Sequence, residues 1–282
     1  MTDHRIGMIV PSSNLTMETE LPRMMRARES AMPADRFTFH SSRMRMKHVT
    51  AEELVRMNAQ TERASLELAD ARPDVVASAC LVAIMAQGAG YHCHAEAQIT
   101  GVMDREGLDI PVVSSAGALL RGLEAAGARR IAMVTPYMKP LTQLVADYIE
   151  DAGIEVIDAL SLEVSDNLEV ARLDPSGLRE HWRNVDTRGA DVLVLSACVQ
   201  MPSLPAIQPV EDEAGLPVVS AATATVFTIL TELGLHPQVP GAGHLLSGEI
   251  TMQRAPRRDP EPIPNAADSV RSDIEGAPAM PQ

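Results

Sequence analysis

The hydrophobic positions of this chain gather in short runs rich in β-branched residues, each followed by turn residues and then by a helical pattern. Such runs are typical of strands buried on both faces of a sheet. Strands that alternate with helices predict an α/β fold with parallel sheets. The six clearest runs are residues 6–10, 75–79, 112–113, 131–134, 192–195 and 218–219.

The apolar runs belong to longer segments that occur twice, in the same order. The three matching pairs are 5–11 (RIGMIVP) with 130–136 (RIAMVTP), 78–80 with 196–198 (both SAC), and 110–116 (IPVVSSA) with 216–222 (LPVVSAA). The distance between the copies shortens steadily along the chain, as expected if the second copy has shorter connections. Three ordered matches indicate that the chain consists of two homologous α/β lobes.

The two lobes do not divide the chain at a single point. We place the N-terminal lobe at residues 1–116 together with about 225–250, and the C-terminal lobe at residues 117–224. After Arg254 the composition changes to six prolines, many charges and few large apolar residues. Such a segment cannot bury enough apolar surface to fold, so we predict a disordered tail at residues 251–282 without a catalytic role.

Both copies place chemically useful residues where a strand ends. In parallel α/β sheets, ligands bind at the carboxyl ends of the strands. The residues at such positions are 11–14, Cys80, 114–115, 136–137, Cys198 and Ser220. If the two sheet edges face each other, they form one cleft with a thiol on each wall.

Composition and charge narrow the possible partners. The 282 residues include 24 Lys and Arg against 38 Asp and Glu, a net charge of −14. This acidity argues against binding to nucleic acid or to anionic membranes. It also requires any site for an anionic ligand to supply its own local donors. Aromatic residues make up only 2%, so the core must be built from Ala, Val, Leu, Ile and the 16 methionines.

The cellular location is predicted from the absence of membrane-spanning and signal-peptide patterns in the sequence. No run approaches the roughly 18 apolar residues of a transmembrane helix, and the first residues lack the apolar region of a signal peptide. Three cysteines in a chain of this length are not a disulfide framework. We therefore expect a cytoplasmic protein with reduced thiols.

Cys80 and Cys198 are the strongest candidates for chemistry. A thiolate is a strong nucleophile toward electron-poor carbon and also a usable base. Each cysteine precedes a turn, where the start of the next helix is expected to lower the thiol pKa. A single cysteine at a strand end is most often an inert core residue. Two at equivalent positions of a duplicated chain favour a catalytic pair over inert packing or a disulfide.

The segment 11–20 (PSSNLTMETE) offers hydroxyl and amide groups just after the first strand. Asn14 and Thr16, followed by Glu18 and Glu20, have the pattern of a helix start, although the residue that would complete a capping box from Thr16 is missing. The same groups could donate hydrogen bonds to a carboxylate. The residues alone leave capping and ligand binding both open.

Other polar residues also have two interpretations. Tyr137 could donate to a carboxylate or simply pack, and residues 114–115 are more simply explained as a helix cap than as donors. Arg43 and Arg45 would point the same way from a strand, where ion pairs with the acidic surface are favoured over anion binding. Residues 92–94 (HCH) do not share a helix face and have no partner cluster, so we predict no metal site.

Five motifs together resemble the maleate cis-trans isomerases of the aspartate/glutamate racemase superfamily. They are residues 11–20, 79–82 (ACLV), 134–137 (VTPY), 166–167 (DN) and 196–205 (SACVQMPSLP). The resemblance extends from about Arg5 to His244 and leaves out the tail. It implies two similar Rossmann-like lobes related by a pseudo-twofold duplication, with the active site in the cleft between them.

The resemblance also implies a chemistry. The expected reaction is conversion of maleate to fumarate through a covalent succinyl-cysteine-like intermediate, without cofactor or metal. By matching motif, Cys80 would be the nucleophile and Cys198 its acid/base partner. Asn14, Tyr137 and Asn167 would bind the substrate. We also expect a homodimer.

Three other functions stay open. An amino-acid racemase of the same superfamily would exchange a proton between the two thiols. However, Leu81-Val82-Ala83 follow Cys80 and Val199-Gln200 follow Cys198, and we expect these residues to form an apolar wall unsuited to an ammonium group. An arylmalonate-type decarboxylase would need only one thiol. From another class, a non-catalytic dicarboxylate-binding protein would tolerate alanine at both cysteines.

Overall fold

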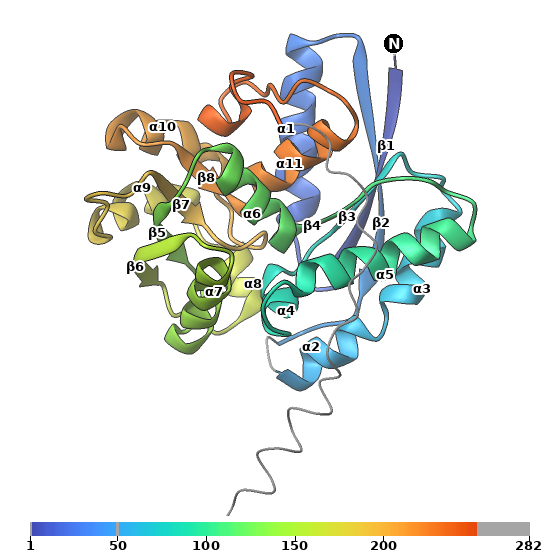
Figure 1. Ribbon diagram of the computed structural model, residues 1–282, viewed down its shortest axis with the longest axis horizontal. Helices are drawn as coiled ribbons and strands as arrows, with labels where there is room; N and C mark the ends of the chain where they lie inside the picture. The colour runs from blue at the N-terminus through green and yellow to red at the C-terminus, as the bar shows by residue number, and fades with distance from the viewer. Residues whose placement is uncertain (1, 49–50, 253–282) are drawn as a thin grey trace, which may run out of the picture.

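The computed structural model describes residues 2–48 and 51–252. The chain forms two lobes, each built on a four-stranded parallel sheet (Figure 1). The predicted α/β fold with two similar lobes is confirmed. The tail predicted for residues 251–282 lies outside the described residues from position 253 onward.

The N-terminal sheet has the strand order β2-β1-β3-β4. Its strands are β1 (Thr2–Pro11), β2 (Asp35–Met44), β3 (Val75–Ser78) and β4 (Val112–Ser114). The accompanying helices are α1 (Met17–Ala31), α2 (Ala51–Asn58), α3 (Thr61–Ala69), α4 (Leu81–Met85), α5 (Tyr91–Arg105) and α6 (Ser115–Ala125).

The C-terminal sheet has the strand order β6-β5-β7-β8, which repeats the first sheet strand for strand. Its strands are β5 (Arg130–Thr135), β6 (Glu155–Ser161), β7 (Val192–Ser196) and β8 (Val218–Ser220). The α-helices are α7 (Lys139–Asp151), α8 (Asn167–Ala171), α9 (Leu178–His181), α10 (Leu204–Ala214) and α11 (Ala221–Glu232). Short 3₁₀ turns occupy η1 (Pro175–Gly177), η2 (Trp182–Asn184) and η3 (His244–Leu246).

The six apolar runs coincide with strands of the structure, and the three repeated segments fall on β1 and β5, β3 and β7, and β4 and β8. The duplication inferred from the sequence is therefore confirmed. No apolar run marked the edge strands β2 and β6. Both strands are only partly buried and carry polar residues among the apolar ones.

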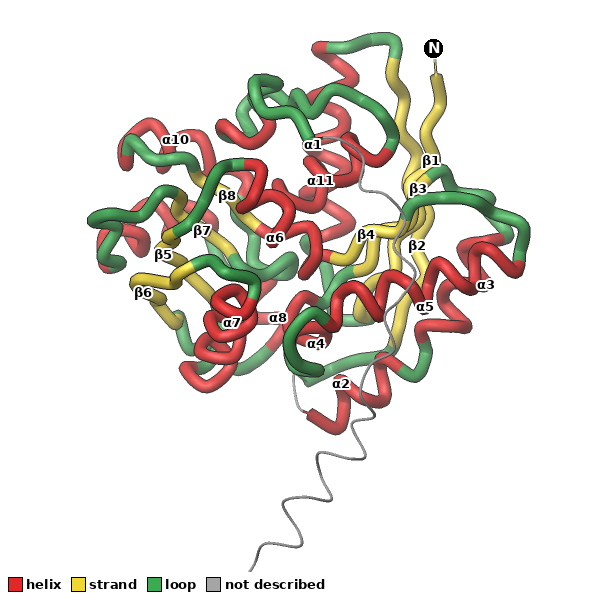
Figure 2. The backbone as a smooth tube through the Cα atoms, in the orientation of Figure 1, coloured by secondary structure: helices red, strands yellow, loops and turns green. Residues whose placement is uncertain are grey.

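The equivalent helices α6 and α11 pack against each other in the middle of the molecule, between the two sheets (Figure 2). A Cβ atom at Gly122 would lie only 2.9 Å from the Cβ of Ala224, so glycine is what allows this close approach. Ser114 and Ser220 cap the two helices through their side chains. Because α11 contacts elements of both lobes, the lobe boundaries stay a prediction.

The core is aliphatic and rich in methionine, as the shortage of aromatic residues predicted. The fully buried side chains include Met8, Met17, Met24, Met25, Met103 and Met133. An unbranched thioether fills irregular gaps that an aromatic ring would otherwise occupy. None of the helices in the described part of the chain has the length and apolar character needed to span a bilayer.

Candidate active site

Cys80 and Cys198 occupy equivalent places, each two residues beyond the end of its strand, β3 or β7. Both are reduced and buried, with 8% and 6% of their surface exposed. A charge on one thiol raises the pKa of the other, so the two sulfur atoms lie within electrostatic reach. The structure thus brings the two predicted thiols together from opposite lobes.

Burial controls the protonation of both thiols. It raises the pKa of Cys80 to about 12, with a smaller contribution in the opposite sense from the Ala83 N–H. It also raises the pKa of Cys198, although the Tyr137 hydroxyl and the N–H groups of Gln200 and Met201 act against it. The expectation that helix starts would leave these thiols with lowered pKa values was wrong. Backbone donors are present, but desolvation of a fully enclosed thiolate outweighs them.

Tyr137 lies just beyond β5 and is buried against the same two thiols. It is hydrogen-bonded to Cys198, and burial together with both cysteines raises its pKa well above the ordinary value for a phenol. The hydroxyl is therefore protonated at neutral pH and acts as a donor. The hydroxyl thus has a polar partner in Cys198, and its donation to a carboxylate stays a prediction.

Asn14 lies in the turn between β1 and α1 and is almost fully buried. Its Oδ1 accepts a hydrogen bond from the Met17 N–H at 2.9 Å, which caps the start of α1. This bond orients the carboxamide with its donor end, Nδ2, away from the helix. Helix capping and ligand binding are thus compatible at this residue, because the cap uses only the acceptor.

Asn167 is the first residue of α8, in the C-terminal lobe, and it is also buried. Its Nδ2 donates to the Ser13 hydroxyl at 2.8 Å, across the boundary between the lobes. Since Ser13 precedes Asn14, the two asparagines approach each other from opposite lobes. All five predicted site residues are therefore buried at facing strand and helix ends.

The assignment of Gln200 to an apolar wall after Cys198 was wrong. The structure places its carboxamide in a polar network among the site residues, a role that the sequence did not predict. Its side chain bonds to Ser13, Leu15 and Asn167. A signal was present in the sequence, because Gln200 is a lone amide that follows the apolar Val199 two positions after Cys198. Nothing in the sequence indicated which distant groups it would meet.

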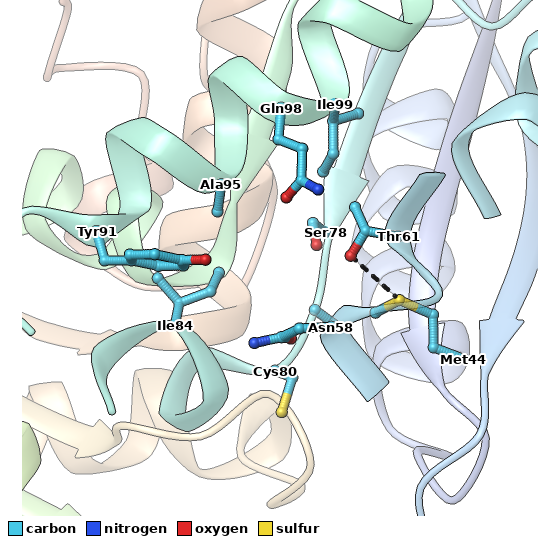
Figure 3. A pocket seen from close by; sticks show the side chains of 11 residues that line it. Met44, Asn58, Thr61, Ser78, Cys80, Ile84, Tyr91, Ala95, Gln98 and Ile99 are labelled. Carbon is cyan, nitrogen blue, oxygen red and sulfur yellow. Dashed lines mark hydrogen bonds between the residues drawn. The ribbon is translucent and has the colours of Figure 1, made fainter. Parts of the chain in front are cut away.

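A small cavity of ≈ 30 Å³ adjoins Cys80 on the side away from the other lobe. This volume holds about one water molecule. Its polar lining comes from Asn58, Thr61, Ser78, Tyr91 and Gln98. Figure 3 shows the Cys80 sulfur pointing away from Thr61, Tyr91 and Gln98. Because the other four candidate residues do not line it, this cavity is not the space between the thiols.

The remaining polar candidates have structural partners. Arg43 forms an ion pair with Glu18 and donates to the Ser12 carbonyl, as expected for an arginine on an acidic surface. His92 contacts the Tyr148 hydroxyl through Nδ1 at 2.7 Å. Within residues 2–48 and 51–252, no group of three His, Cys, Asp or Glu side chains could hold a metal ion.

Comparison with known proteins places this site in a family. The model of the arylmalonate decarboxylase family matches residues 6–246. The maleate isomerase of Geobacillus stearothermophilus is 59% identical over 245 residues, which cover 87% of this chain and 98% of the relative. The chain belongs to the maleate isomerase family. The maleate isomerase of Alcaligenes faecalis is 57% identical over 88% of this chain and 98% of its own length.

Solved maleate isomerases share the whole two-lobed architecture. A variant of the Pseudomonas putida maleate isomerase, solved with maleate, is 54% identical with a TM-score of 0.87, covering 89% of this chain and 100% of that one. A cysteine variant of the Nocardia farcinica enzyme carries a covalently bound succinylcysteine intermediate. It is 47% identical with a TM-score of 0.84, covering 87% of this chain and 98% of that one.

Proposed function

We propose that this protein is a cofactor-free maleate cis-trans isomerase, which converts maleate to fumarate through a covalent adduct on Cys80. The observation that carries the proposal is the pair of buried thiols at equivalent strand ends of two facing lobes. A relative of the same architecture has been solved with maleate, and another with a succinylcysteine.

The chemistry begins from the barrier to rotation about a C=C bond, which is removed only while that bond is single. In the proposed reaction the Cys80 sulfur adds to C2 of maleate, and the π electrons move toward C3 and its carboxylate. Cys198 gives its proton to C3 and takes up the proton that Cys80 loses on bonding to C2, which leaves a succinyl adduct free to rotate about C2–C3. After rotation, Cys198 passes its proton to the departing Cys80 sulfur and takes a proton back from C3 as the C=C bond re-forms. Covalent catalysis thus divides one forbidden rotation into permitted steps.

The raised thiol pKa values suit this reaction in two ways. At neutral pH both thiols are protonated, so neither repels an incoming dianion. Formation of the adduct uses the Cys198 proton for the new C–H bond, and the Cys80 proton replaces it on Cys198. No proton has to enter or leave the buried site during the cycle.

Donors from both lobes account for how a protein of net charge −14 accepts a dicarboxylate. In this proposal the amide groups of Asn14 and Asn167 and the Tyr137 hydroxyl bind the two carboxylates. Preorganised donors in a buried site stabilise the charge that builds up as the sulfur adds, and they do so far more strongly than donors in water.

The apolar residues behind the thiols argue against the racemase alternative. Leu81 and Val82 follow Cys80, and Val199 follows Cys198; all three are buried. An ammonium group placed against them would lose its hydration without gaining acceptors.

The direct test is incubation with maleate, with fumarate followed by NMR. We expect turnover by the wild type and by Cys93→Ser, and none by Cys80→Ala or Cys198→Ala. Aspartate, glutamate and an arylmalonate are the competing substrates. Racemisation or decarboxylation without fumarate formation would reject the proposal, and binding of maleate with no turnover would favour a non-catalytic binding protein.

A second measurement assigns the roles of the two thiols. With Cys198→Ala and maleate, mass spectrometry of the peptides is expected to show an adduct of substrate mass on Cys80. An adduct that appeared only on Cys198, in the reciprocal Cys80→Ala variant, would reverse the two roles.

We also propose that the protein works as a cytoplasmic homodimer. The buried, reduced thiols support a reducing compartment, and the family resemblance supports the dimer. Light scattering on the purified protein measures the oligomeric mass, and a monomer that is fully active would reject the dimer.

A further inference from the structure

Gln200 is the buried residue whose contacts tie the site together. Only 3% of its surface is exposed. Its Nε2 group donates to the carbonyls of Ser13 and Asn167, both at 2.8 Å, and its Oε1 accepts from the Leu15 N–H at 3.0 Å. Both donor hydrogens and the acceptor of the carboxamide are therefore in use.

Two of these bonds lie on either side of Asn14 in the chain. The Ser13 carbonyl and the Leu15 N–H belong to the peptide groups on either side of Asn14. The Gln200 carboxamide pairs with both, as a peptide group of a neighbouring strand would. On its own chain, the Asn14 turn is closed by a bond from the Asn14 N–H to the Pro11 carbonyl at 2.9 Å. Gln200 thus holds this turn from the opposite lobe.

The remaining contacts reach the other half of the site. The second Nε2 bond fixes the backbone of Asn167 at the start of α8. The Gln200 N–H lies 3.4 Å from the Cys198 sulfur, and the Gln200 carbonyl accepts from the Thr16 hydroxyl at 2.6 Å. One residue therefore contacts the Cys198 thiol, the Asn167 backbone and the turn that carries Asn14.

The chemistry of the contacts specifies a carboxamide. Two carbonyl oxygens and one N–H group face this side chain, so it must supply two donors and one acceptor. A glutamate would place a charged acceptor against two carbonyls, and a methionine would leave all three backbone groups without their partner. Both changes preserve the size of the side chain, so they test hydrogen bonding with little change in packing.

From this geometry we infer that Gln200 is a positioning residue, which sets the separation between the substrate-binding amides of Asn14 and Asn167. The inference rests on the proposed function. A dicarboxylate held at both ends requires its two donors at a fixed spacing, and here the donors come from different lobes. Loss of the Gln200 bonds therefore weakens substrate binding as well as turnover.

The test compares Gln200→Met and Gln200→Glu with the wild type, using initial rates of fumarate formation from maleate. For Gln200→Met we expect KM to rise at least about tenfold and kcat to fall, since each unmet buried partner costs on the order of tenfold. For Gln200→Glu we expect a similar loss near pH 8. As the pH is lowered toward about 5.5, its rate relative to wild type should recover, because the protonated acid regains one donor.

The matched control is Glu20→Ala. Glu20 also joins the two lobes from a buried position, through the N–H groups of Ser203 and Leu204, but it touches neither asparagine. We expect this variant to lose thermal stability and keep the KM of the wild type.

If Gln200→Met behaves in the same way, or if the relative rate of Gln200→Glu does not respond to pH, Gln200 is only structural and the inference is overturned. If Gln200→Met does not fold, the pH dependence of the Gln200→Glu rate relative to wild type decides whether Gln200 is a positioning residue. A wild type without turnover would instead reject the proposed function and this inference with it.

Discussion

The Tyr137 hydroxyl is hydrogen-bonded to the Cys198 thiol, and it is the strongest of the groups that favour the ionised form of that cysteine. Tyr137 itself stays protonated because burial and the two thiols raise its pKa. A donor that cannot ionise is thus directed at the sulfur which, in the proposed reaction, gives and takes the C3 proton.

Replacement of Tyr137 by Phe is expected to slow isomerisation. Without the hydroxyl, the pKa of Cys198 rises further, and the single O–H that bonds to Cys198 in the free protein can no longer turn to the bound substrate. We expect kcat/KM to fall by about 10²-fold, the usual effect of losing one preorganised donor. The measurement is the rate of fumarate formation, together with the pH profile of Cys198 alkylation in a Cys80→Ala, Cys93→Ser background. An unchanged alkylation profile would show that Tyr137 does not act on the thiol.

Thiol reactivity provides a second prediction. Cys93 is exposed on α5, whereas Cys80 and Cys198 are buried with raised pKa values. At pH 7, iodoacetamide should therefore modify Cys93 first and leave activity intact. Only the thiolate reacts, and the pKa of Cys80 is about 12, so its alkylation should accelerate about tenfold per pH unit and still be rising above pH 9. Peptide mass spectrometry separates the three sites. A Cys80 rate that levels off below pH 8 would contradict the raised pKa.

The sequence alone predicted the architecture and the position of the thiols. The repeated SAC segments fix Cys80 and Cys198 at strand ends, because a buried parallel strand needs a continuous apolar run and the copies share it. Asn14, Tyr137 and Asn167 entered through the family resemblance, since short polar segments at turns look alike whether they cap a helix or bind a ligand.

Two features of the site could not be predicted from the sequence, for the same physical reason. The role of Gln200 depends on backbone groups 33 to 187 positions away in the chain. The pKa of each thiol depends on how completely both lobes enclose it. Local pattern identified the helix starts beyond the cysteines, but the extent of desolvation is a property of the assembled molecule.

Glu20 provides a prediction about stability. Its carboxylate accepts from the Ser203 and Leu204 N–H groups, both at 2.7 Å, at the start of α10. Replacement by Ala leaves two backbone donors unmet and should lower the free energy of unfolding by about 1–3 kcal/mol. Replacement by Gln keeps an acceptor for both donors and should be far milder.

The same residue has a pH signature. Burial is the largest influence on Glu20 and raises its pKa above 4.5. A carboxyl with a raised pKa in the folded state favours folding most at low pH, and this contribution is lost as the pH rises through the raised pKa. Glu20→Gln cannot titrate, so its stability relative to wild type should improve from about pH 4.5 to about pH 8. Urea unfolding at several pH values measures this difference, and a difference that did not change with pH would show that Glu20 titrates normally.

The backbone at Cys80 leads to the last prediction. Its φ is 80° and its ψ 65°, a left-handed conformation that turns the chain from β3 into α4. Cys198 at the equivalent position has no positive φ. A side chain in the left-handed region costs on the order of 1 kcal/mol, and glycine avoids this cost.

Both Cys80→Gly and Cys80→Ala should be inactive, but the glycine variant should be more stable than the alanine variant by about 1 kcal/mol. At Cys198 the order should reverse, because glycine there gains only backbone freedom in the unfolded chain. Urea unfolding of the four variants checks both orders. If alanine were the more stable replacement at both positions, the Cys80 backbone would not be strained, and its conformation could not be a feature that the protein maintains to aim the nucleophile.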